Sequence, residues 1–452
     1  MGAMKLRFVR TLAAACALVL AAASMPAAAV RPPKLQYEIT TLPNGLTLVL
    51  SEDHSTPIVH LNLTYHVGSK NEKQGRTGFA HLFEHLMFKG SKNVQPEAHT
   101  SMVSSVGGQS NAYTTDDETV FWETVPAQYL PMILWLEADR MATLRIDKDT
   151  FTNERDVVKE ERRMRVDNQP YGRLNEIIYD QAFSAHPYKH ATIGSMEDLE
   201  AASVEDVRDF YQTYVPSNAT MTLVGDFDST QAIQLVNQYL GRVPKAAREV
   251  PRDIPKEPLQ TKEKRVTLQQ PWPLPAVVVA YHITYDGNPD SYPLHIAAKV
   301  LSDGQSSRIY KKLVYETQMA VAAFGQANLI EDPNLFYAVA IVQPGNKTED
   351  VANALIAEIE RLKTEPITDR ELQRSKNQFA RDYILGRESN QQKAGVLSHA
   401  VVIHRDIKTA DAEFDIFQNM SVGDVQRVAR TYFKAENRLV LTLTPSGKAG
   451  AQ

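Results

Sequence analysis

The chain has 452 residues, of which 49 are Lys or Arg, 54 are Asp or Glu and one is Cys, and its formal net charge is −5. With 43% hydrophobic and 23% charged residues, this composition excludes an intrinsically disordered chain, a polybasic nucleic-acid binder and a disulfide scaffold. At roughly 100–200 residues per domain, the length predicts more than one domain.

The first 29 residues have the three parts of a secretory signal peptide. The basic start contains Lys5, Arg7 and Arg10. An apolar run follows at residues 12–23, and a small-residue cleavage site at residues 27–29. The apolar run is shorter than the ~20 residues that a membrane-spanning helix needs. We therefore predict cleavage and export, most simply to a bacterial periplasm, with no membrane span afterwards. Cleavage would also remove Cys16, so a metal site in the mature chain would have to use histidines and carboxylates.

The rest of the chain contains two halves with a shared pattern. Residues 203–214 match residues 421–432, and in each copy a serine, Ser203 or Ser421, is expected to cap a helix that leads into a strand. Further upstream each half has a β-rich run, residues 58–67 and residues 276–285, that is followed by a helical segment. This suggests a duplicated domain.

A proline-rich and charged segment, residues 244–264, separates these halves and has the composition of a linker. Within each half strands and helices come in blocks, without strict alternation, which favours an α+β fold. We predict two homologous domains, residues 30–243 and 265–452, each a mainly antiparallel β-sheet with helices packed on it.

The sequence His81-Leu82-Phe83-Glu84-His85 is the centre of the functional prediction. Two histidines four residues apart on a helix lie on one face and can bind one zinc ion. Glu84 flanks that face, where it could take a proton from a water activated by the metal. The neighbouring residues are almost all apolar, and burying these three polar groups is costly unless a metal pairs them. A hydrogen-bonded core histidine is the alternative for either histidine alone.

The pattern of residues 149–167 predicts a charged helix that begins at residue 149 or 150 and could supply a third zinc ligand. One stripe of this helix, at spacings of three and four, contains Glu154, Val157, Val158, Glu161 and Arg165. Glu161 would point inward beside the two valines, and Glu154 could order a ligand from two turns away. These residues alone leave Glu160 and a purely solvated face open as alternatives. Six other histidines have no defensible metal spacing and are predicted to be surface or packing residues: His54, His60, His66, His99, His186 and His190.

The segment from Gly78 to Gly90, with its HxxEH order, resembles the pitrilysin/insulinase family of zinc peptidases, the inverzincins. It is most similar to the two-domain subgroup of the mitochondrial-processing-peptidase type. The family takes its third ligand from the last Glu of a Glu-Arg-x₅-Glu pattern, which stands here at residues 154–161. The resemblance therefore implies zinc bound by His81, His85 and Glu161, with Glu154 in a supporting role.

The resemblance also implies a substrate-binding strand. Family members use the segment matching residues 108–113 as a sheet edge along which a peptide lies as an added strand, which accepts many side chains. Asn111, Ala112 and Tyr113 are the implied contacts, although an asparagine after Gly107 and Gly108 would otherwise be assigned to a loop.

In one respect the chain departs from the family. Many relatives carry an Arg and, seven residues later, a Tyr that donate hydrogen bonds to the substrate and the oxyanion. Val314 and Val321 stand at these positions, and the nearby Arg308 and Tyr310 have the wrong spacing and are predicted to lie on a helix surface. This implies a heterodimer with a second two-domain subunit that supplies the Arg and Tyr, and leaves a homodimer open.

The resulting prediction is the catalytic subunit of a zinc metalloendopeptidase that hydrolyses unfolded or extended oligopeptides with a metal-activated water. The alternative is a non-catalytic assembly subunit of the same fold. A third hypothesis, metal or peptide binding without hydrolysis, differs because it predicts no effect of Glu84→Gln. Nucleic acid is not an expected partner.

Overall fold

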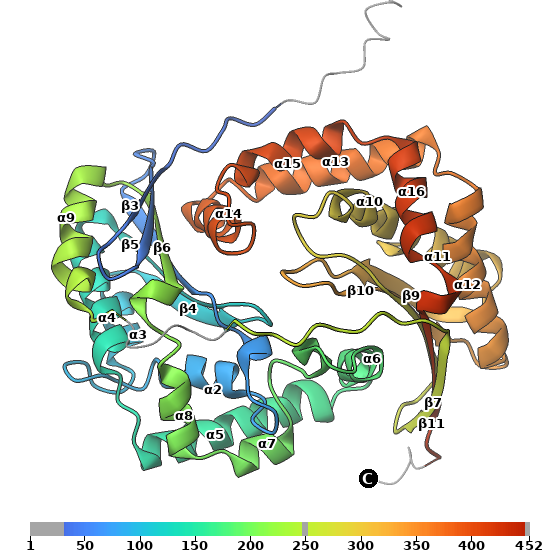
Figure 1. Cartoon of the computed structure of the whole chain (residues 1–452), viewed down its shortest axis with the longest axis horizontal. Coiled ribbons are helices and arrows are strands. Elements are labelled where there is room, and N and C mark those ends of the chain that lie inside the picture. The colour runs from blue at the N-terminus through green and yellow to red at the C-terminus, as the bar shows by residue number, and fades with distance from the viewer. Residues whose placement is uncertain (1–30, 246–251, 448–452) are drawn as a thin grey trace, which may run out of the picture. The chain divides into compact units, whose positions relative to one another are not determined.

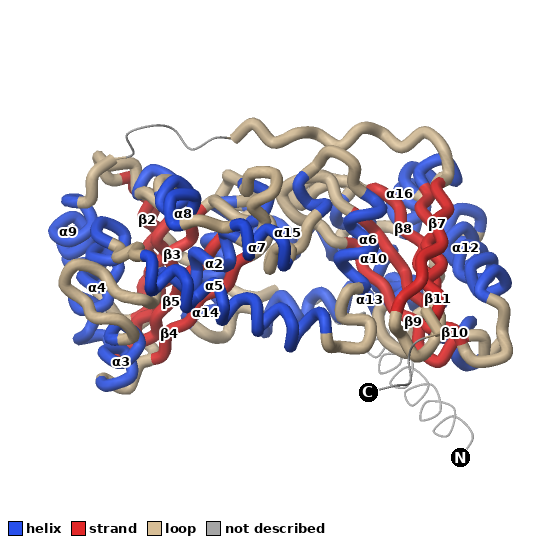
Figure 2. The backbone as a smooth tube through the Cα atoms, turned by 90° about the horizontal axis from the view of Figure 1, so that it is seen from below, coloured by secondary structure: helices blue, strands red, loops and turns tan. Residues whose placement is uncertain are grey.

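Two β-sheets with helices on their faces make up most of the described chain (Figures 1 and 2). The computed structural model describes residues 31–245 and 252–447, so the predicted signal peptide lies outside the described residues. The architecture confirms the predicted α+β fold. In the described ranges no helix is both long enough and apolar enough to cross a membrane.

The first sheet has six strands in the order β1-β2-β6-β3-β5-β4. Its strands are β1 (Glu38–Thr41), β2 (Thr47–Glu52), β3 (Ile58–Tyr65), β4 (Gln109–Thr114), β5 (Thr119–Pro126) and β6 (Ala219–Gly225). Neighbours are antiparallel except for β2 and β6, which pair in parallel. Strand β4 lies at one edge and therefore has one unpaired side.

The second sheet repeats this plan with five strands in the order β7-β11-β8-β10-β9. Its strands are β7 (Lys264–Gln270), β8 (Ala276–His282), β9 (Ala320–Ala327), β10 (Leu335–Val342) and β11 (Arg438–Pro445). Strand β7 pairs in parallel with β11, as β2 does with β6 in the first sheet, and the other pairs are antiparallel. Without β1, the two sheets have the same strand order, which agrees with the predicted duplication.

The helices fall between the strands in both halves. Before the linker they are α2 (Phe79–Leu86), α3 (Ala98–Ser105), α4 (Leu130–Thr143), α5 (Lys148–Arg162), α6 (Leu174–Ala182), α7 (Met196–Ala201), α8 (Val204–Tyr211) and α9 (Ser229–Tyr239). After it they are α10 (Ser291–Ser302), α11 (Arg308–Tyr310), α12 (Thr348–Thr364), α13 (Asp369–Leu385), α14 (Asn390–Val402), α15 (Thr409–Gln418) and α16 (Val422–Tyr432).

The duplicated serines cap corresponding helices, as predicted. The Ser203 hydroxyl accepts the Asp206 N–H at the start of α8, and the Asp206 carboxylate accepts the Ser203 N–H in return. Ser421 and Asp424 form the same capping box at the start of α16. Each box satisfies two backbone donors that the first helical turn leaves free.

Each sheet has one face covered by its own half of the chain and one face covered by a helix from the other half. Leu397 and Ala400 of α14 pack with Val49 and Val224 on the first sheet (Figure 1). Leu174, Ile177 and Ile178 of α6 pack in the same way on the second sheet, against Val278, Val339 and Leu441. This exchange of helices joins the two halves through buried apolar surface, which stabilises both.

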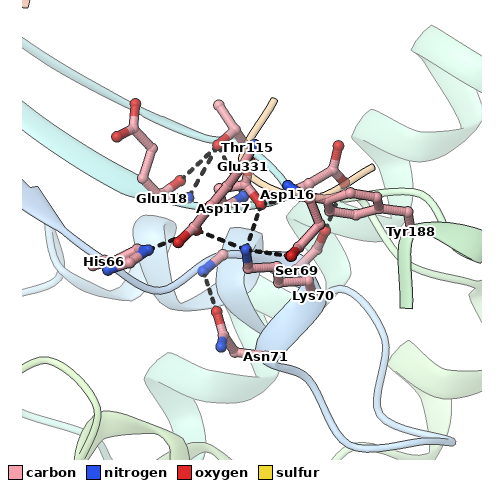
Figure 3. A network of polar contacts seen from close by, with 12 residues as sticks. His66, Ser69, Lys70, Asn71, Thr115, Asp116, Asp117, Glu118, Tyr188 and Glu331 are labelled. Carbon is pink, nitrogen blue, oxygen red and sulfur yellow. Dashed lines mark hydrogen bonds and ion pairs between the residues drawn. The ribbon is translucent and has the colours of Figure 1, made fainter. Parts of the chain in front are cut away.

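A buried ion cluster makes a second connection between the halves (Figure 3). The Lys70 Nζ lies 2.9 Å from Asp117 Oδ1, 2.7 Å from Glu331 Oε2 and 2.8 Å from Asp332 Oδ2. Only 4% of the Lys70 side chain is exposed. Tyr188 donates its hydroxyl to Asp117, and His66 lies 2.7 Å from Glu331. Charges removed from water in this way must be paired with one another.

The predicted linker, residues 244–264, has no helix or strand at its described residues 244–245 and 252–263, but its last residue is wrong, because Lys264 begins β7. The segment is nevertheless held in place. The Glu257 carboxylate accepts backbone N–H groups of Ser184, Ala185 and His186, just after α6.

Candidate metal centre and substrate edge

Helix α2 presents His81, Glu84 and His85 on its less buried face. Its other residues, Phe79, Ala80, Leu82, Phe83 and Leu86, are buried. The Phe83 ring stacks on Tyr214 with its centroid 4.0 Å away. This packing fixes the rotation of the helix, and therefore the direction of the three polar side chains.

The N-terminus of α2 has no capping side chain of its own, because Gly78 occupies the N-cap with φ 90°. The buried Glu72 carboxylate takes over this role, accepting the N–H groups of Gly78 at 2.9 Å and Ala80 at 2.7 Å. A side chain at Gly78 would also bring a Cβ within 2.7 Å of the Ile193 carbonyl oxygen. Sequence reasoning missed Glu72, since only the fold shows which carboxylate reaches the helix end.

Helix α5 supplies the acidic residues facing α2. It begins at Lys148, capped by Asp147, whose side chain accepts the Thr150 N–H, and so starts slightly earlier than predicted. Its last turn continues as a π-helix over Arg163–Asp167. The predicted inward stripe is correct for Glu154 and Val158, which are buried. It is wrong for Val157, which is 48% exposed, and for Arg165, whose side chain is 75% exposed. Adjacent residues of a helix point about 100° apart, and here only Val158 lies on the buried side.

The structure brings His81, His85 and Glu161 together. The Nε2 atoms of His81 and His85 lie 3.7 Å and 3.4 Å from the same oxygen, Glu161 Oε2. One donor atom from each of the three residues lies within 4.8 Å of the others. The competitor Glu160 is instead exposed and ion-paired with Arg163.

The surroundings of these residues suit a metal. Burial and the neighbouring His85 lower the pKa of His81 to about 4, so its imidazole is neutral and has a lone pair to donate. Glu154 Oε2 lies 3.6 Å from His85 Nδ1 and can orient that ring through the nitrogen that faces away from Glu161. Lys89 lies 3.1 Å from the other Glu154 oxygen. The donor set of two histidines and one glutamate is typical of catalytic zinc sites.

Glu84 lies between this cluster and strand β4. Its Oε2 accepts the Thr114 hydroxyl at 2.6 Å. Burial raises the pKa of Glu84, and the bond from Thr114 offsets only part of that rise. A carboxylate with a raised pKa holds a proton more readily than an exposed one, which suits a general base.

The segment Asn111–Ala112–Tyr113 lies within β4 and not in a loop, because each residue pairs with β5 in the antiparallel register Asn111↔Trp122 to Tyr113↔Val120. Since β4 is the edge strand and Thr114 at its end reaches Glu84, an added strand there would run past the carboxylate. The Asn111 side chain accepts the N–H of Ala112. Tyr113 is 43% exposed.

The two valines at the positions of the family's Arg and Tyr lie in the second half. Val314 is partly buried against the second core, and Val321 on β9 is 42% exposed. Arg308 forms two hydrogen bonds of 2.8 Å with Glu371, and the Tyr310 ring packs against Tyr315. These contacts agree with the structural roles predicted for Arg308 and Tyr310.

Two further groups of potential metal ligands occur in the described residues. His99, Glu123 and Glu137 are fully buried, but Arg140 forms ion pairs with both glutamates. The guanidinium therefore already supplies the positive charge that a metal would bring. Asp286, His399 and His404 form the other group, which the sequence did not indicate because Asp286 is more than a hundred residues from the histidines.

An HxxEH helix faced by a glutamate from a second helix, on paired α+β domains, is the arrangement of the inverted-motif class of zinc peptidases. Comparisons with known proteins agree. Residues 47–195 match the model of the insulinase family (peptidase family M16), and residues 201–379 match the model named peptidase M16 inactive domain. The chain belongs to the insulinase family.

Individual relatives extend over most of the chain. A Helicobacter pylori protein named zinc protease PqqE is 32% identical over 432 residues, 95% of this chain and 96% of its own. The β subunit of the mitochondrial processing peptidase of Saccharomyces cerevisiae is 24% identical, over 75% of this chain and 76% of its own. The crystal structure of a Helicobacter pylori protease has a TM-score of 0.86 at 31% identity, covering 91% of this chain and all of that one.

Proposed function

We propose that this chain is the catalytic subunit of a zinc endopeptidase that hydrolyses extended or unfolded peptides. The observation that carries the proposal is the convergence of His81, His85 and Glu161 within 4.8 Å. The Glu84 carboxylate is on α2, the helix that also carries the two histidines. Zinc held by these three residues would supply a Lewis acid that polarises the peptide carbonyl and lowers the pKa of water.

The chain's own residues supply proton transfer and positioning. The Thr114 hydroxyl holds the Glu84 carboxylate through Oε2, and this carboxylate takes the proton from the attacking water. Glu84 then delivers this proton to the leaving amine. Strand β4 supplies unpaired backbone groups along which an extended peptide would be held in line with Glu84, largely independently of its side chains.

The proposal includes a second subunit. Val314 and Val321 have no hydrogen-bond donors in their side chains, so this chain lacks the Arg and Tyr that its relatives direct at the substrate. A different partner of the same two-domain fold would supply them, whereas the second chain of a homodimer would bring only another Val314 and another Val321. Recovery of a partner that itself carries HxxEH would contradict this part of the proposal.

We also propose that the chain is exported to the periplasm after cleavage near residue 29. Cell fractionation and N-terminal sequencing of the recovered chain test this point. An uncleaved chain in the cytoplasm would refute it.

The central test is hydrolysis of a quenched, unstructured peptide by the mature chain and its Glu84→Gln variant, with zinc content measured for both. Glutamine keeps the size of the side chain and an oxygen to accept the Thr114 hydroxyl, but it cannot act as a base. We expect both proteins to bind zinc, and only the wild type to cleave the peptide once the partner subunit is added to each. Glu160→Gln, on the exposed side of α5, is the matched control and should cleave normally.

The remaining outcomes separate the alternatives. Equal cleavage by wild type and Glu84→Gln would contradict the role of Glu84. Full activity of the isolated chain would remove the need for a partner. If a zinc-loaded chain does not cleave the peptide even with its partner, two hypotheses remain: a non-catalytic assembly subunit, or a protein that binds metal or peptide without hydrolysis.

A further inference from the structure

Asp286, His399 and His404 meet where helix α14 ends. His399 lies in the last turns of α14, which ends at Val402, and the chain then turns so that the His404 N–H bonds to the His399 carbonyl at 3.3 Å. Asp286 follows strand β8. The Nε2 atoms of His399 and His404 lie 2.7 Å and 3.0 Å from one oxygen, Asp286 Oδ2.

This arrangement repeats the geometry of the first site. There the rings of His81 and His85 are 4.8 Å apart at an angle of 79°, and here the rings of His399 and His404 are 5.0 Å apart at 73°. In both places two Nε2 atoms face a single carboxylate oxygen. The two clusters therefore offer the same donor set, two imidazoles and one carboxylate.

His404 is held as a ligand would be. Its side chain is 4% exposed, and its buried Nε2 lies 3.0 Å from Asp286 Oδ2 without a hydrogen bond of regular geometry to any described residue. Its other nitrogen, Nδ1, lies 2.9 Å from the Thr409 hydroxyl. A hydrogen bond at Nδ1 fixes the ring so that Nε2 points into the cluster.

Two further acidic side chains lie near the cluster. Besides Asp286, the carboxylates of Glu118 and Glu413 lie close enough to His399 to interact with it electrostatically. Glu118 Oε2 is buried and has no hydrogen-bond partner within the described ranges. Arg387 offsets part of the charge at Glu413. An acidic environment of this kind around two imidazoles would favour a bound divalent cation.

We propose that Asp286, His399 and His404 bind a divalent transition metal of the zinc or cobalt type, at a second site that is separate from His81, His85 and Glu161. Two donors about 2.0 Å from one tetrahedral ion are about 3.3 Å apart, so the two Nε2–Oδ2 distances lengthen by roughly 0.3–0.6 Å when the metal binds. Because α14 packs on the first sheet and Asp286 follows a strand of the second, the metal ties the two halves together.

The test is the metal content of the full mature chain after chelation, reloading with zinc and dialysis. We expect about two ions per chain for the wild type and about one for Asp286→Asn and for His404→Ala. A His81→Ala/His85→Ala chain should also retain about one. His54→Ala is the matched control, because His54 is exposed and its two nitrogens face different carboxylates, Asp226 and Glu52, and it should keep both ions.

A second readout guards against variants that fail to fold. Zinc should raise the melting temperature of the His81→Ala/His85→Ala chain, and adding Asp286→Asn should abolish this rise while circular dichroism still reports a folded protein. One ion in the wild type, or none in the His81→Ala/His85→Ala chain, would overturn the proposal. So would a melting temperature that depends on Asp286 but not on zinc, since the cluster would then be an ion pair only. None of these readouts requires peptidase activity.

Discussion

Replacing Lys70 by methionine tests the ion cluster that connects the two halves. Methionine keeps an unbranched side chain of similar length but removes the ammonium group from Asp117, Glu331 and Asp332, all within 2.9 Å of it. The Lys70 and Asp117 side chains are only 4% and 6% exposed, so water cannot readily replace the ammonium group at Asp117. Breaking a buried pair by removing one partner costs about 3–5 kcal/mol, a factor of about 10²–10⁴ in the unfolding equilibrium.

The control is Lys73→Met, three residues away. Lys73 pairs with Asp209 at 2.6 Å, but its side chain is 76% exposed. Exposed pairs contribute about 0–1 kcal/mol, so Lys73→Met should change the free energy of unfolding by no more than that. Urea denaturation of both variants followed by circular dichroism measures the difference. Equal stability of the two variants would refute the assigned importance of burial.

The pH dependence gives a second check of the same reasoning. Burial alone would raise the pKa of Glu331, but hydrogen bonds from His66 and Lys70 lower it to about 2. A carboxylate with a lowered pKa stabilises the fold above its unfolded value near 4.3, and this contribution is lost as the pH falls toward 2. The difference in the free energy of unfolding between wild type and Lys70→Met should therefore be largest above about pH 5 and should become smaller between pH 4 and 2. A difference independent of pH would contradict the electrostatic account.

Three further predictions concern the site and the duplicated helices. Glu161→Gln should lower zinc affinity by at least tenfold, measured with a competing chelator, whereas the exposed Glu160→Gln should leave it unchanged. Thr114→Val should lower the peptidase rate about tenfold, because Glu84 loses a 2.6 Å hydrogen bond. Thr114→Ser keeps the hydroxyl and should have the wild-type rate. Equal rates for wild type and Thr114→Val would show that the bond is unimportant. Ser421→Ala should cost about 1 kcal/mol in urea denaturation by removing the cap of α16, and no change would mean that water satisfies these groups.

Local patterns made much of the fold predictable. The strands β3 and β8, the capping serines Ser203 and Ser421 and the HxxEH helix all arise from residues near one another in sequence, where periodicity and capping preferences act directly. The error at Val157 shows the limit of this reasoning. A charged helix has several stripes that fit a spacing of three and four, and only packing against a neighbouring helix decides which one is buried.

Contacts between distant segments could not be predicted in this way. Glu72 holds the start of α2, and Glu331 and Asp332 pair with Lys70 across more than 250 residues of sequence. The cluster of Asp286 with His399 and His404 has the same origin. No local spacing in the sequence marks such residues, because the tertiary fold alone sets their separation.

The position of β11 has a consequence for how the second half is made. This strand, Arg438–Pro445, is the last of the described chain, yet it lies between β7 and β8 and pairs with both. During synthesis β7, β8, β9 and β10 emerge first, and a gap stays between β7 and β8 until the final strand arrives. Contacts of such long sequence separation slow folding. The sheet therefore cannot close before residues 438–445 are available, and a truncation before residue 438 would remove a strand from inside the sheet and not from its edge.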